Sequence, residues 1–220
     1  MLRSLLRTAC WLLPPGGLKN RLLRALGHRV HPSARVGVCL LTGATDVSVG
    51  AGATIGHGNV FRGLRGLHIG ADAIVGQFNW WSIAPSLELG GPESGHGVAV
   101  LGDHAVLTNR HYLDISGGLR LAEFATLGGV RCTVLTHSVD LDSGKQTLAA
   151  VVLDHQAFIS TNCVVMAGSH LTERAVLAAG SVTALGGRYA AHTLHGGVPA
   201  KVIRPIDGAY FHRTEAWISQ

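Results

Sequence analysis

Aliphatic residues recur at every sixth position in the second half of the chain. The rungs of this ladder are Leu153, Ile159, Val165, Leu171, Leu177 and Thr183. Two positions before them stand mostly small residues, namely Val151, Ala157, Cys163, Ser169, Ala175 and Ser181. A period of six fits neither the 3.6-residue period of a helix nor the simple alternation of a strand. It predicts an all-β coil in which each hexad forms one flat face and one corner, and three hexads complete a triangular turn.

Shorter runs of the same ladder precede this region, and the phase slips between them. The runs are Val49, Ile55 and Phe61; Ile69, Val75 and Trp81; Leu101 and Leu107; and Ile115, Leu121 and Leu127. An insertion that leaves the coil and returns need not preserve the count, so the slips indicate inserted loops. Two stretches rich in turn residues, 85–98 and 138–150, are expected to protrude. Loops of this kind are where solenoids place binding and chemistry.

The first 45 residues differ from the rest in charge, since they contain seven basic residues and no acidic one. Leucines on both sides of a Pro-Pro-Gly-Gly break at 14–17 predict two short amphipathic helices. One interpretation is a helical cap, residues 1–29, over the open end of the coil. The other is an anchor that lies on an anionic membrane surface. The apolar run is far shorter than a membrane-spanning helix requires, and we expect no signal peptide.

The composition favours one continuous solenoid over two domains. The chain has 220 residues, of which 30 are glycine, 47% are hydrophobic and 14% are charged. We expect residues 30–188 to form the coil and 189–220 a C-terminal extension. So apolar a prism is expected to self-associate. The basic residues near the N-terminus lack an aromatic stacking face, which argues against nucleic-acid binding.

Four cysteines, Cys10, Cys39, Cys132 and Cys163, show neither a CxxC pair nor a metal-ligand spacing. This pattern predicts reduced structural cysteines in a cytoplasmic protein. Among thirteen histidines, His137 is distinguished by its position where regular coil gives way to the second loop. A neutral imidazole there could act as a general base. The alternative interpretation is an ordinary surface histidine at a corner.

Several motifs together resemble the hexapeptide-repeat acyltransferases. They are the late hexads, the run LAAGSV at 177–182, the sequence THS at 136–138 and the terminal GGVPAKVIR at 196–204. The resemblance covers about residues 30–205 and is strongest to sugar and polysaccharide O-acetyltransferases, such as the galactoside and maltose acetyltransferases. It implies a left-handed parallel β-helix assembled as a homotrimer, with acetyl-CoA bound between subunits. The handedness rests on the resemblance alone, because parallel crossovers are generally right-handed.

The resemblance assigns His137 as the catalytic base that takes a proton from the acceptor hydroxyl, without an acyl-enzyme. The segment from Asn109 to Asp114 is expected to stack near His137, one turn earlier. His111 is a second catalytic candidate, and Asn109 competes with it for the same position. Asp114 is assigned to the acceptor, whose sugar hydroxyls would donate to its carboxylate. The alternative is that these polar groups only satisfy a corner.

For the donor, Thr161 and Ala179 match the small residues that line the pantetheine groove of the family. Lys201 and Arg204 match the basic positions that meet the CoA phosphates. Their alternative interpretation is an ordinary basic tail. The chain departs from the family at Thr183-Ala184-Leu185, where a threonine-lysine pair is usual, and this removes one expected CoA contact.

Two other functions are consistent with this fold. A non-catalytic trimeric scaffold is favoured by the missing CoA contact and the basic N-terminus. A γ-type carbonic anhydrase would bind a metal through histidines such as His104, His111 and His137, but Asp142 stands where the second histidine of the close pair is needed. We therefore expect no metal. The predicted acceptor is a sugar or glycan intermediate made at the inner face of the membrane, and the predicted location is cytoplasmic.

Overall fold

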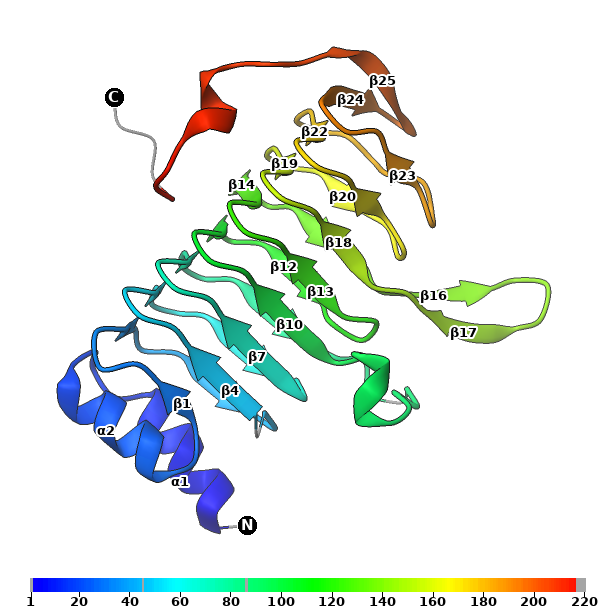
Figure 1. The fold of residues 1–220 in the computed structure, drawn as a ribbon. Helices are drawn as coiled ribbons and strands as arrows, with labels where there is room; N and C mark the ends of the chain where they lie inside the picture. The colour runs from blue at the N-terminus through cyan, green and yellow to red at the C-terminus, as the bar shows by residue number, and fades with distance from the viewer. Residues whose placement is uncertain (1, 45, 86, 217–220) are drawn as a thin grey trace.

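The chain folds into a triangular prism of parallel strands preceded by two helices (Figure 1). The computed structural model describes residues 2–44, 46–85 and 87–216. After α1 (Leu2–Trp11) and α2 (Gly17–Ala25), the chain winds through three sheets, and each sheet is one face of the prism. The all-β solenoid with short N-terminal helices that the sequence predicts is confirmed.

The first two sheets collect one strand from each turn of the coil, and the third collects one from each turn up to β20. The first sheet contains β1 (Arg29–Val30), β4 (Asp46–Val49), β7 (Gly66–Ile69), β10 (Val98–Leu101), β13 (Leu119–Leu121), β18 (Val151–Leu153), β21 (His170–Leu171) and β23 (Arg188–Tyr189). The second contains β2 (Arg35–Val36), β5 (Thr54–Ile55), β8 (Ile74–Val75), β11 (Val106–Asn109), β14 (Thr126–Val130), β19 (Phe158–Ile159), β22 (Val176–Leu177), β24 (Thr193–Gly197) and the antiparallel β25 (Ala200–Pro205). The third contains β3 (Leu40–Thr42), β6 (Val60–Arg62), β9 (Trp80–Ser82), β12 (Tyr112–Asp114), β15 (Thr133–Val134) and β20 (Val164–Val165).

The predicted rungs lie inside the prism, one above another, except that Leu113 and not the predicted Ile115 is the third-sheet rung of its turn, and Leu41 and Val134 are further rungs that the hexad pattern did not include. In the first sheet Val49, Ile69, Leu101, Leu121, Leu153 and Leu171 are in register. In the second, Ile55, Val75, Leu107, Leu127, Ile159 and Leu177 are in register. In the third, Leu41, Phe61, Trp81, Leu113, Val134 and Val165 are in register. All of these side chains are buried, and each contributes roughly 1.5–3 kcal/mol on burial.

Turns of different length explain the phase slips. Leu153 pairs with Leu171 one turn later, an 18-residue turn, whereas Val49 pairs with Ile69 over 20 residues. The turn from Leu121 to Leu153 is longer because it contains an antiparallel hairpin of β16 (His137–Asp140) and β17 (Lys145–Leu148). The turn that ends at β10 contains the other predicted loop, with the short helix η1 (Pro92–Ser94). Both insertions leave the coil at the corner between the third and first sheets (Figure 1).

A buried lysine fastens the two helices to the first turn of the coil. The Lys19 Nζ donates hydrogen bonds to the carbonyl oxygens of Trp11 (2.7 Å), Leu13 (3.0 Å) and Gly37 (2.6 Å). Burial lowers the pKa of Lys19 to about 8, so the group remains an ammonium ion with three donors at neutral pH. The buried Trp11 packs edge-on against Phe61, with 5.8 Å between ring centroids. The helices therefore cover one end of the apolar column.

The chain turns back after the last coil. From β25 it runs along the outside of the second sheet (Figure 1) and includes the short helix η2 (Ala209–His212). The Tyr210 hydroxyl donates to Thr126 Oγ1 (3.1 Å), and Gln156 Nε2 donates to the Phe211 carbonyl oxygen (2.8 Å). These contacts attach the end of the chain to the second sheet.

Replacing Lys19 by methionine tests the anchoring role. The carbonyl oxygens of Trp11 and Gly37 would lose a buried donor, so we expect Lys19→Met to lower the free energy of unfolding by about 1–3 kcal/mol. Urea denaturation followed by circular dichroism measures this change. The control is Lys145→Met, because Lys145 is exposed on β17 and should change stability by less than about 0.5 kcal/mol. Equal losses in both variants would contradict the anchoring role.

Candidate functional site

A buried carboxylate lies at the corner where both insertions leave the coil. Asp114 Oδ1 accepts hydrogen bonds from the Ser116 amide (3.0 Å) and hydroxyl (2.5 Å). Its Oδ2 accepts from the Thr136 amide (2.7 Å), the Thr136 hydroxyl (2.9 Å) and the His137 amide (3.0 Å). Burial alone would raise the pKa of Asp114, but the hydrogen bonds from Ser116, His137 and Thr136 outweigh it and hold that pKa below its ordinary value. Asp114 is therefore ionised at neutral pH.

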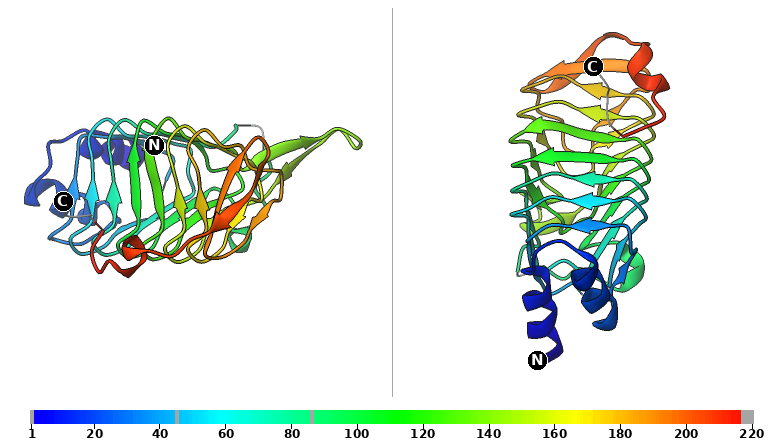
Figure 2. Two further views of the ribbon diagram at one scale, coloured as in Figure 1. Left: turned by 90° about the horizontal axis from the view of Figure 1, so that it is seen from above. Right: turned by 90° about the vertical axis from the view of Figure 1, so that its left-hand side faces the viewer.

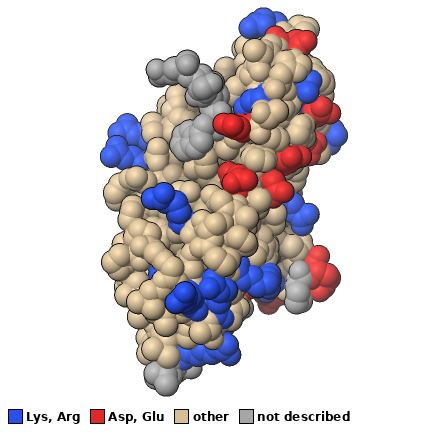
Figure 3. All heavy atoms as spheres, turned by 60° about the vertical axis from the view of Figure 1, so that its left-hand side comes forward, with Lys and Arg blue, Asp and Glu red and all other residues tan. Residues whose placement is uncertain are grey.

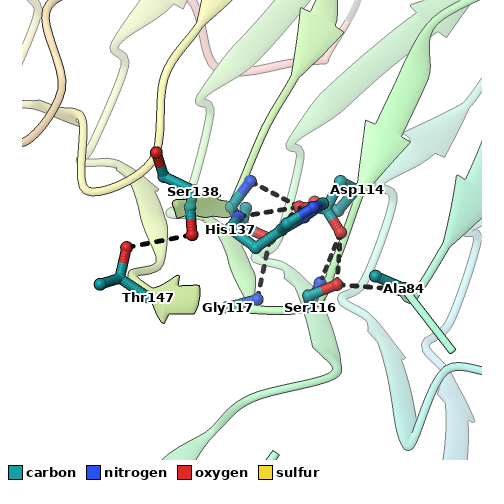
Figure 4. A network of polar contacts seen from close by, with 8 residues as sticks. Ala84, Asp114, Ser116, Gly117, His137, Ser138 and Thr147 are labelled. Carbon is teal, nitrogen blue, oxygen red and sulfur yellow. Dashed lines mark hydrogen bonds and ion pairs between the residues drawn. The ribbon is translucent and has the colours of Figure 1, made fainter. Parts of the chain in front are cut away.

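His137 completes this cluster. Its Nδ1 lies 2.8 Å from Asp114 Oδ2 (Figure 4). An ionised carboxylate can only accept, so Nδ1 carries a proton, and in the neutral form of the ring the lone pair is on Nε2. Within the part of the chain that the structure describes, Nε2 makes no hydrogen bond, and the side chain is 33% exposed. The arrangement holds an imidazole in the tautomer that a general base requires.

Backbone packing positions the pair. Asp114 and His137 come from successive turns, which are joined by the register of Leu113 with Val134. The Gly117 amide donates to Thr136 Oγ1 (2.8 Å). A Cβ at Gly117 would collide with the Thr136 carbonyl oxygen and lie 2.7 Å from the Ala149 nitrogen, so only glycine fits without a shift. These close contacts leave the Asp114–His137 pair little freedom to change its geometry.

The two insertions begin beside this pair. The Ser116 hydroxyl accepts a hydrogen bond from the Ala84 amide (3.0 Å), immediately before the 85–98 segment. The hairpin β16–β17 begins at His137 itself, and Thr147 from its second strand donates to the Ser138 carbonyl oxygen (3.4 Å; Figure 4). The candidate base therefore lies between two segments that protrude from an otherwise regular coil.

His111 and Asn109 lie at the opposite edge of the third sheet. His111 directly precedes β12, and its Nδ1 accepts from the Cys132 amide (3.0 Å). Its Nε2 lies 3.0 Å from Thr108 Oγ1. Burial lowers the pKa of His111 to about 4, so the ring is neutral and both of its nitrogens are engaged inside the fold. Asn109 Oδ1 accepts from the Gln77 amide (2.6 Å). Of the segment expected to stack near His137, only Asp114 reaches it.

His111 belongs to a column of polar corner residues. The Asn79 amide donates to Asn59 Oδ1 (3.1 Å), and the His111 amide donates to Asn79 Oδ1 (2.8 Å). The column continues through Cys132 and Cys163, which like Cys10 and Cys39 are buried free thiols. Along this edge a backbone amide thus repeatedly donates to the side chain of the corner residue one turn earlier, because buried amides between strands need acceptors.

The predicted donor residues lie on the far side of the third sheet from His137. Thr161 and Ala179 occupy the corner between the second and third sheets on adjacent turns, where the Gly180 amide donates to the Thr161 carbonyl oxygen (3.0 Å). Lys201 and Arg204 are exposed on β25, opposite Gly196 and Leu194 of β24. One chain therefore groups the donor residues with one another but does not bring them to His137.

Sequence reasoning identified His137 and Asp114 separately and missed Ser116, Thr136 and Gly117 as their supports. The available signal was the polar pair Asp114 and Ser116 directly after a rung, at the edge of a predicted turn. Within the described ranges, no group of three or more His, Cys, Asp or Glu side chains is arranged to hold a metal ion.

Comparisons with known proteins concern the fold. No protein-family model and no curated protein matches the chain. A polysialic acid O-acetyltransferase of known structure is similar with a TM-score of 0.51 at 11% identity, over 81% of this chain and 84% of that one. A hexapeptide-repeat acetyltransferase from Vibrio cholerae O1 biovar eltor, complexed with acetyl coenzyme A, has a TM-score of 0.45 at 18% identity, over 64% of this chain and 72% of that one. A maltose O-acetyltransferase from Clostridium difficile 630 has a TM-score of 0.39 at 16% identity, over 94% of this chain and 89% of that one.

The likeness to the polysialic acid O-acetyltransferase extends over most of both chains, at an identity that speaks for the fold alone. The family resemblance indicated by the sequence is confirmed at this level. The chain is a left-handed parallel β-helix, the fold of the hexapeptide-repeat acyltransferases.

Proposed function

We propose that the chain is an acyltransferase that transfers an acetyl group from acetyl-CoA to a hydroxyl of a sugar or glycan intermediate. The Asp114–His137 pair carries this proposal, because it presents an imidazole nitrogen that is free of internal hydrogen bonds in the described part of the chain, beside two protruding segments. The motifs around His137 and at 196–204, which resemble those of sugar O-acetyltransferases, favour acetyl-CoA and a sugar hydroxyl. A fold shared with a polysialic acid O-acetyltransferase is consistent with both.

In this mechanism His137 is the general base. Its Nε2 would remove the proton of the acceptor hydroxyl as that oxygen attacks the thioester carbonyl carbon, and the proton would pass to the CoA sulfur as the carbon–sulfur bond breaks and CoA leaves as a thiol. A general base of this kind raises the rate roughly 10²–10⁴-fold. The imidazolium that forms is stabilised by the ionised carboxylate of Asp114 through Nδ1. Both Asp114 oxygens are already used by Ser116, Thr136 and His137. We therefore assign Asp114 to positioning His137 and not to binding the acceptor.

The residues that match donor positions fit the chemistry of a CoA ester. A bound acetyl-CoA would supply the thioester carbonyl that the acceptor oxygen attacks. Lys201 and Arg204 are exposed, and in the described part of the chain neither forms an ion pair. Arg204 also borders an open groove of about 340 Å³, whose other walls include Phe158, Val176 and Tyr210. Basic groups beside an apolar groove suit a phosphate-bearing ligand with an apolar arm.

Two chains are needed to complete such a site, because the donor residues and His137 lie at opposite edges of the third sheet. We propose a homotrimer in which the His137 corner of one subunit faces the donor side of its neighbour. The outer surface of the third sheet supports this arrangement. Trp80 and Tyr112 are exposed there, with parallel rings whose centroids are 6.4 Å apart, and Leu40 is exposed on the same sheet. Exposed apolar surface of this kind is typical of a subunit contact.

A non-catalytic trimeric scaffold is the second candidate. It is favoured by the segment Thr183-Ala184-Leu185, in which Thr183 is buried and no basic side chain replaces the lysine usual in the family. The two functions differ in whether the chain binds acetyl-CoA and whether it transfers the acetyl group.

Removing the imidazole of His137 tests the reaction. We expect His137→Ala to lower kcat by roughly 10²–10⁴, measured as transfer from labelled acetyl-CoA into free sugars, nucleotide sugars and lipid-linked glycans. The matched control is His170→Ala on β21. His170 also lies 2.7 Å from a carboxylate, that of Asp154, but on the first sheet. Equal transfer by wild type and His137→Ala would rule out the assigned mechanism.

Replacing Asp114 by asparagine tests the positioning role. We expect kcat to fall by up to about 10⁴-fold, because an asparagine amide no longer fixes the tautomer of His137 or stabilises its imidazolium, with an altered pH profile and little change in the KM for acetyl-CoA. The free energy of unfolding should also fall by about 1–3 kcal/mol at neutral pH, because the charged acceptor is lost.

The stability difference between wild type and Asp114→Asn should depend on pH. The folded pKa of Asp114 is depressed, so its contribution is complete above the unfolded value near 3.8 and is lost as pH falls through the lower folded value. Urea denaturation from neutral pH downward should therefore show that the difference in free energy of unfolding between the wild type and Asp114→Asn becomes smaller in acid. A difference that stays constant with pH would show that the carboxylate is not ionised in the fold.

Neutralising Lys201 and Arg204 tests the donor site. At 100 times its Kd, acetyl-CoA should stabilise the wild type by about 2.7 kcal/mol. Lys201→Gln/Arg204→Gln should weaken binding at least about tenfold, because two charge-assisted hydrogen bonds are lost. Calorimetry measures both the stabilisation by acetyl-CoA and its affinity. The control variant Arg62→Gln/Lys145→Gln removes the same number of positive charges from exposed positions elsewhere. No binding by the wild type would favour the scaffold.

A further inference from the structure

The two N-terminal helices have one face on the coil and an apolar face in solvent. Trp11, Lys19 and Leu23 point into the molecule and are buried. On the other side the two helices and the residues directly after α1 expose six leucines, which we call the outer leucine face: Leu5, Leu6, Leu12, Leu13, Leu18 and Leu22. Leu18 is 70% exposed and Leu5 61% exposed. Closing the end of the coil therefore does not account for these leucines.

The outer leucine face is continuous across both helices. Leu5 lies on α1 seven residues before Leu12, which directly follows the end of that helix at Trp11, and Leu18 and Leu22 are four residues apart on one face of α2. Between the helices runs an open groove of about 350 Å³. Its walls are apolar and include Leu6 and Leu13 on one side and Leu22 and Leu26 on the other. Contiguous apolar surface of this kind marks an interaction site.

Arginines border this face. Arg3, Arg7, Arg21 and Arg24 lie on the two helices, and the first 45 residues contain no acidic side chain. Arg7 donates to the Leu26 carbonyl oxygen and Arg24 to the Val30 carbonyl oxygen, each at 3.0 Å, whereas Arg3 and Arg21 are exposed. Among the described residues none of these four arginines has an ion-pair partner. Figure 3 shows a group of Lys and Arg side chains at the helical end of the molecule, whereas most of the Asp and Glu side chains in that view lie farther along the coil. The partner of this surface should therefore be both apolar and anionic.

A lipid surface fits this combination better than a second copy of the chain. A two-fold contact would place the same arginines against each other, which is unfavourable for like charges. An anionic bilayer offers headgroups to the arginines and acyl chains to the leucines. The helices have 10 and 9 residues, and no helix in the described ranges is long and apolar enough to cross a membrane.

We infer that the outer leucine face docks on the surface of an anionic lipid bilayer, with its leucines at the acyl boundary and the exposed Arg3 and Arg21 at the headgroups. The attachment is rigid, because Lys19 ties both helices to the first turn through the carbonyl oxygens of Trp11 and Gly37. This inference concerns the helical end of the prism and is independent of acyl transfer at His137.

Vesicle flotation of the full chain tests this inference. The probes are large unilamellar vesicles of phosphatidylcholine alone and of equimolar phosphatidylcholine and phosphatidylglycerol. We expect the wild type to float with the anionic vesicles only, and the bound fraction to fall as salt rises from about 0.05 to 0.5 M, because salt screens the arginines. Equal binding to both vesicles, or binding to neither, would overturn the proposal.

Two variants separate the apolar and the charged parts. Leu5→Ser/Leu12→Ser/Leu18→Ser should weaken partitioning at least about tenfold, and Arg3→Gln/Arg21→Gln roughly thirty-fold, from about 1 kcal/mol for each arginine. The controls Leu141→Ser/Leu185→Ser and Arg62→Gln/Lys145→Gln change exposed residues elsewhere and should bind like the wild type.

Circular dichroism and the unfolding midpoint show whether each variant keeps the wild-type fold, so that lost binding reports on the surface alone. Helix variants that bind like their controls would contradict the inference. Sedimentation measures self-association in the absence of vesicles. If the leucine variant dissociates an oligomer while the wild type does not bind vesicles, the face belongs to a contact between copies, and the proposal is wrong.

Discussion

Every inward-facing rung has to lie above the rung of the preceding turn, and the rest of the molecule is arranged around that constraint. A shift of one residue in a strand would turn its rung outward and bury its neighbour. Extra residues can therefore enter only at corners, where the chain can leave and return without changing the register. Both insertions use the corner between the third and first sheets, and Asp114 and His137 meet at that corner.

The same constraint decides how much could be predicted from the sequence. The regular half, from Leu153 to Thr183, shows its period directly because each of its turns has 18 residues. Earlier turns could be recognised only in pieces, since their lengths differ. The contact of Asp114 with His137 depends on Leu113 lying opposite Val134, a 21-residue step that matches neither regular turn length. Without that register, the sequence left His111 and Asn109 competing for the position beside His137 and assigned Asp114 to the acceptor.

The contrast between two histidines shows why residue type alone could not define the site. His111 and His137 stand at the two edges of one sheet, on adjacent turns. His111 is buried and its nitrogens are occupied by Cys132 and Thr108, whereas His137 keeps one nitrogen outside the internal hydrogen bonds. A polar residue at a corner serves the fold when its partners are backbone groups of the next turn. A polar residue becomes available for chemistry when only one of its polar atoms is engaged by hydrogen bonds within the fold.

Lys19 has a consequence for the chemistry of the whole chain. Of its three lysines, Lys145 and Lys201 are exposed, and only Lys19 is buried. An amine-reactive reagent therefore meets two accessible amines on the coil and a third that is shielded as long as the helices stay attached. The rate at which Lys19 is labelled measures how often the N-terminal end opens, separately from the unfolding of the coil. The lysine that holds the helices in place is thus also a reporter of their detachment.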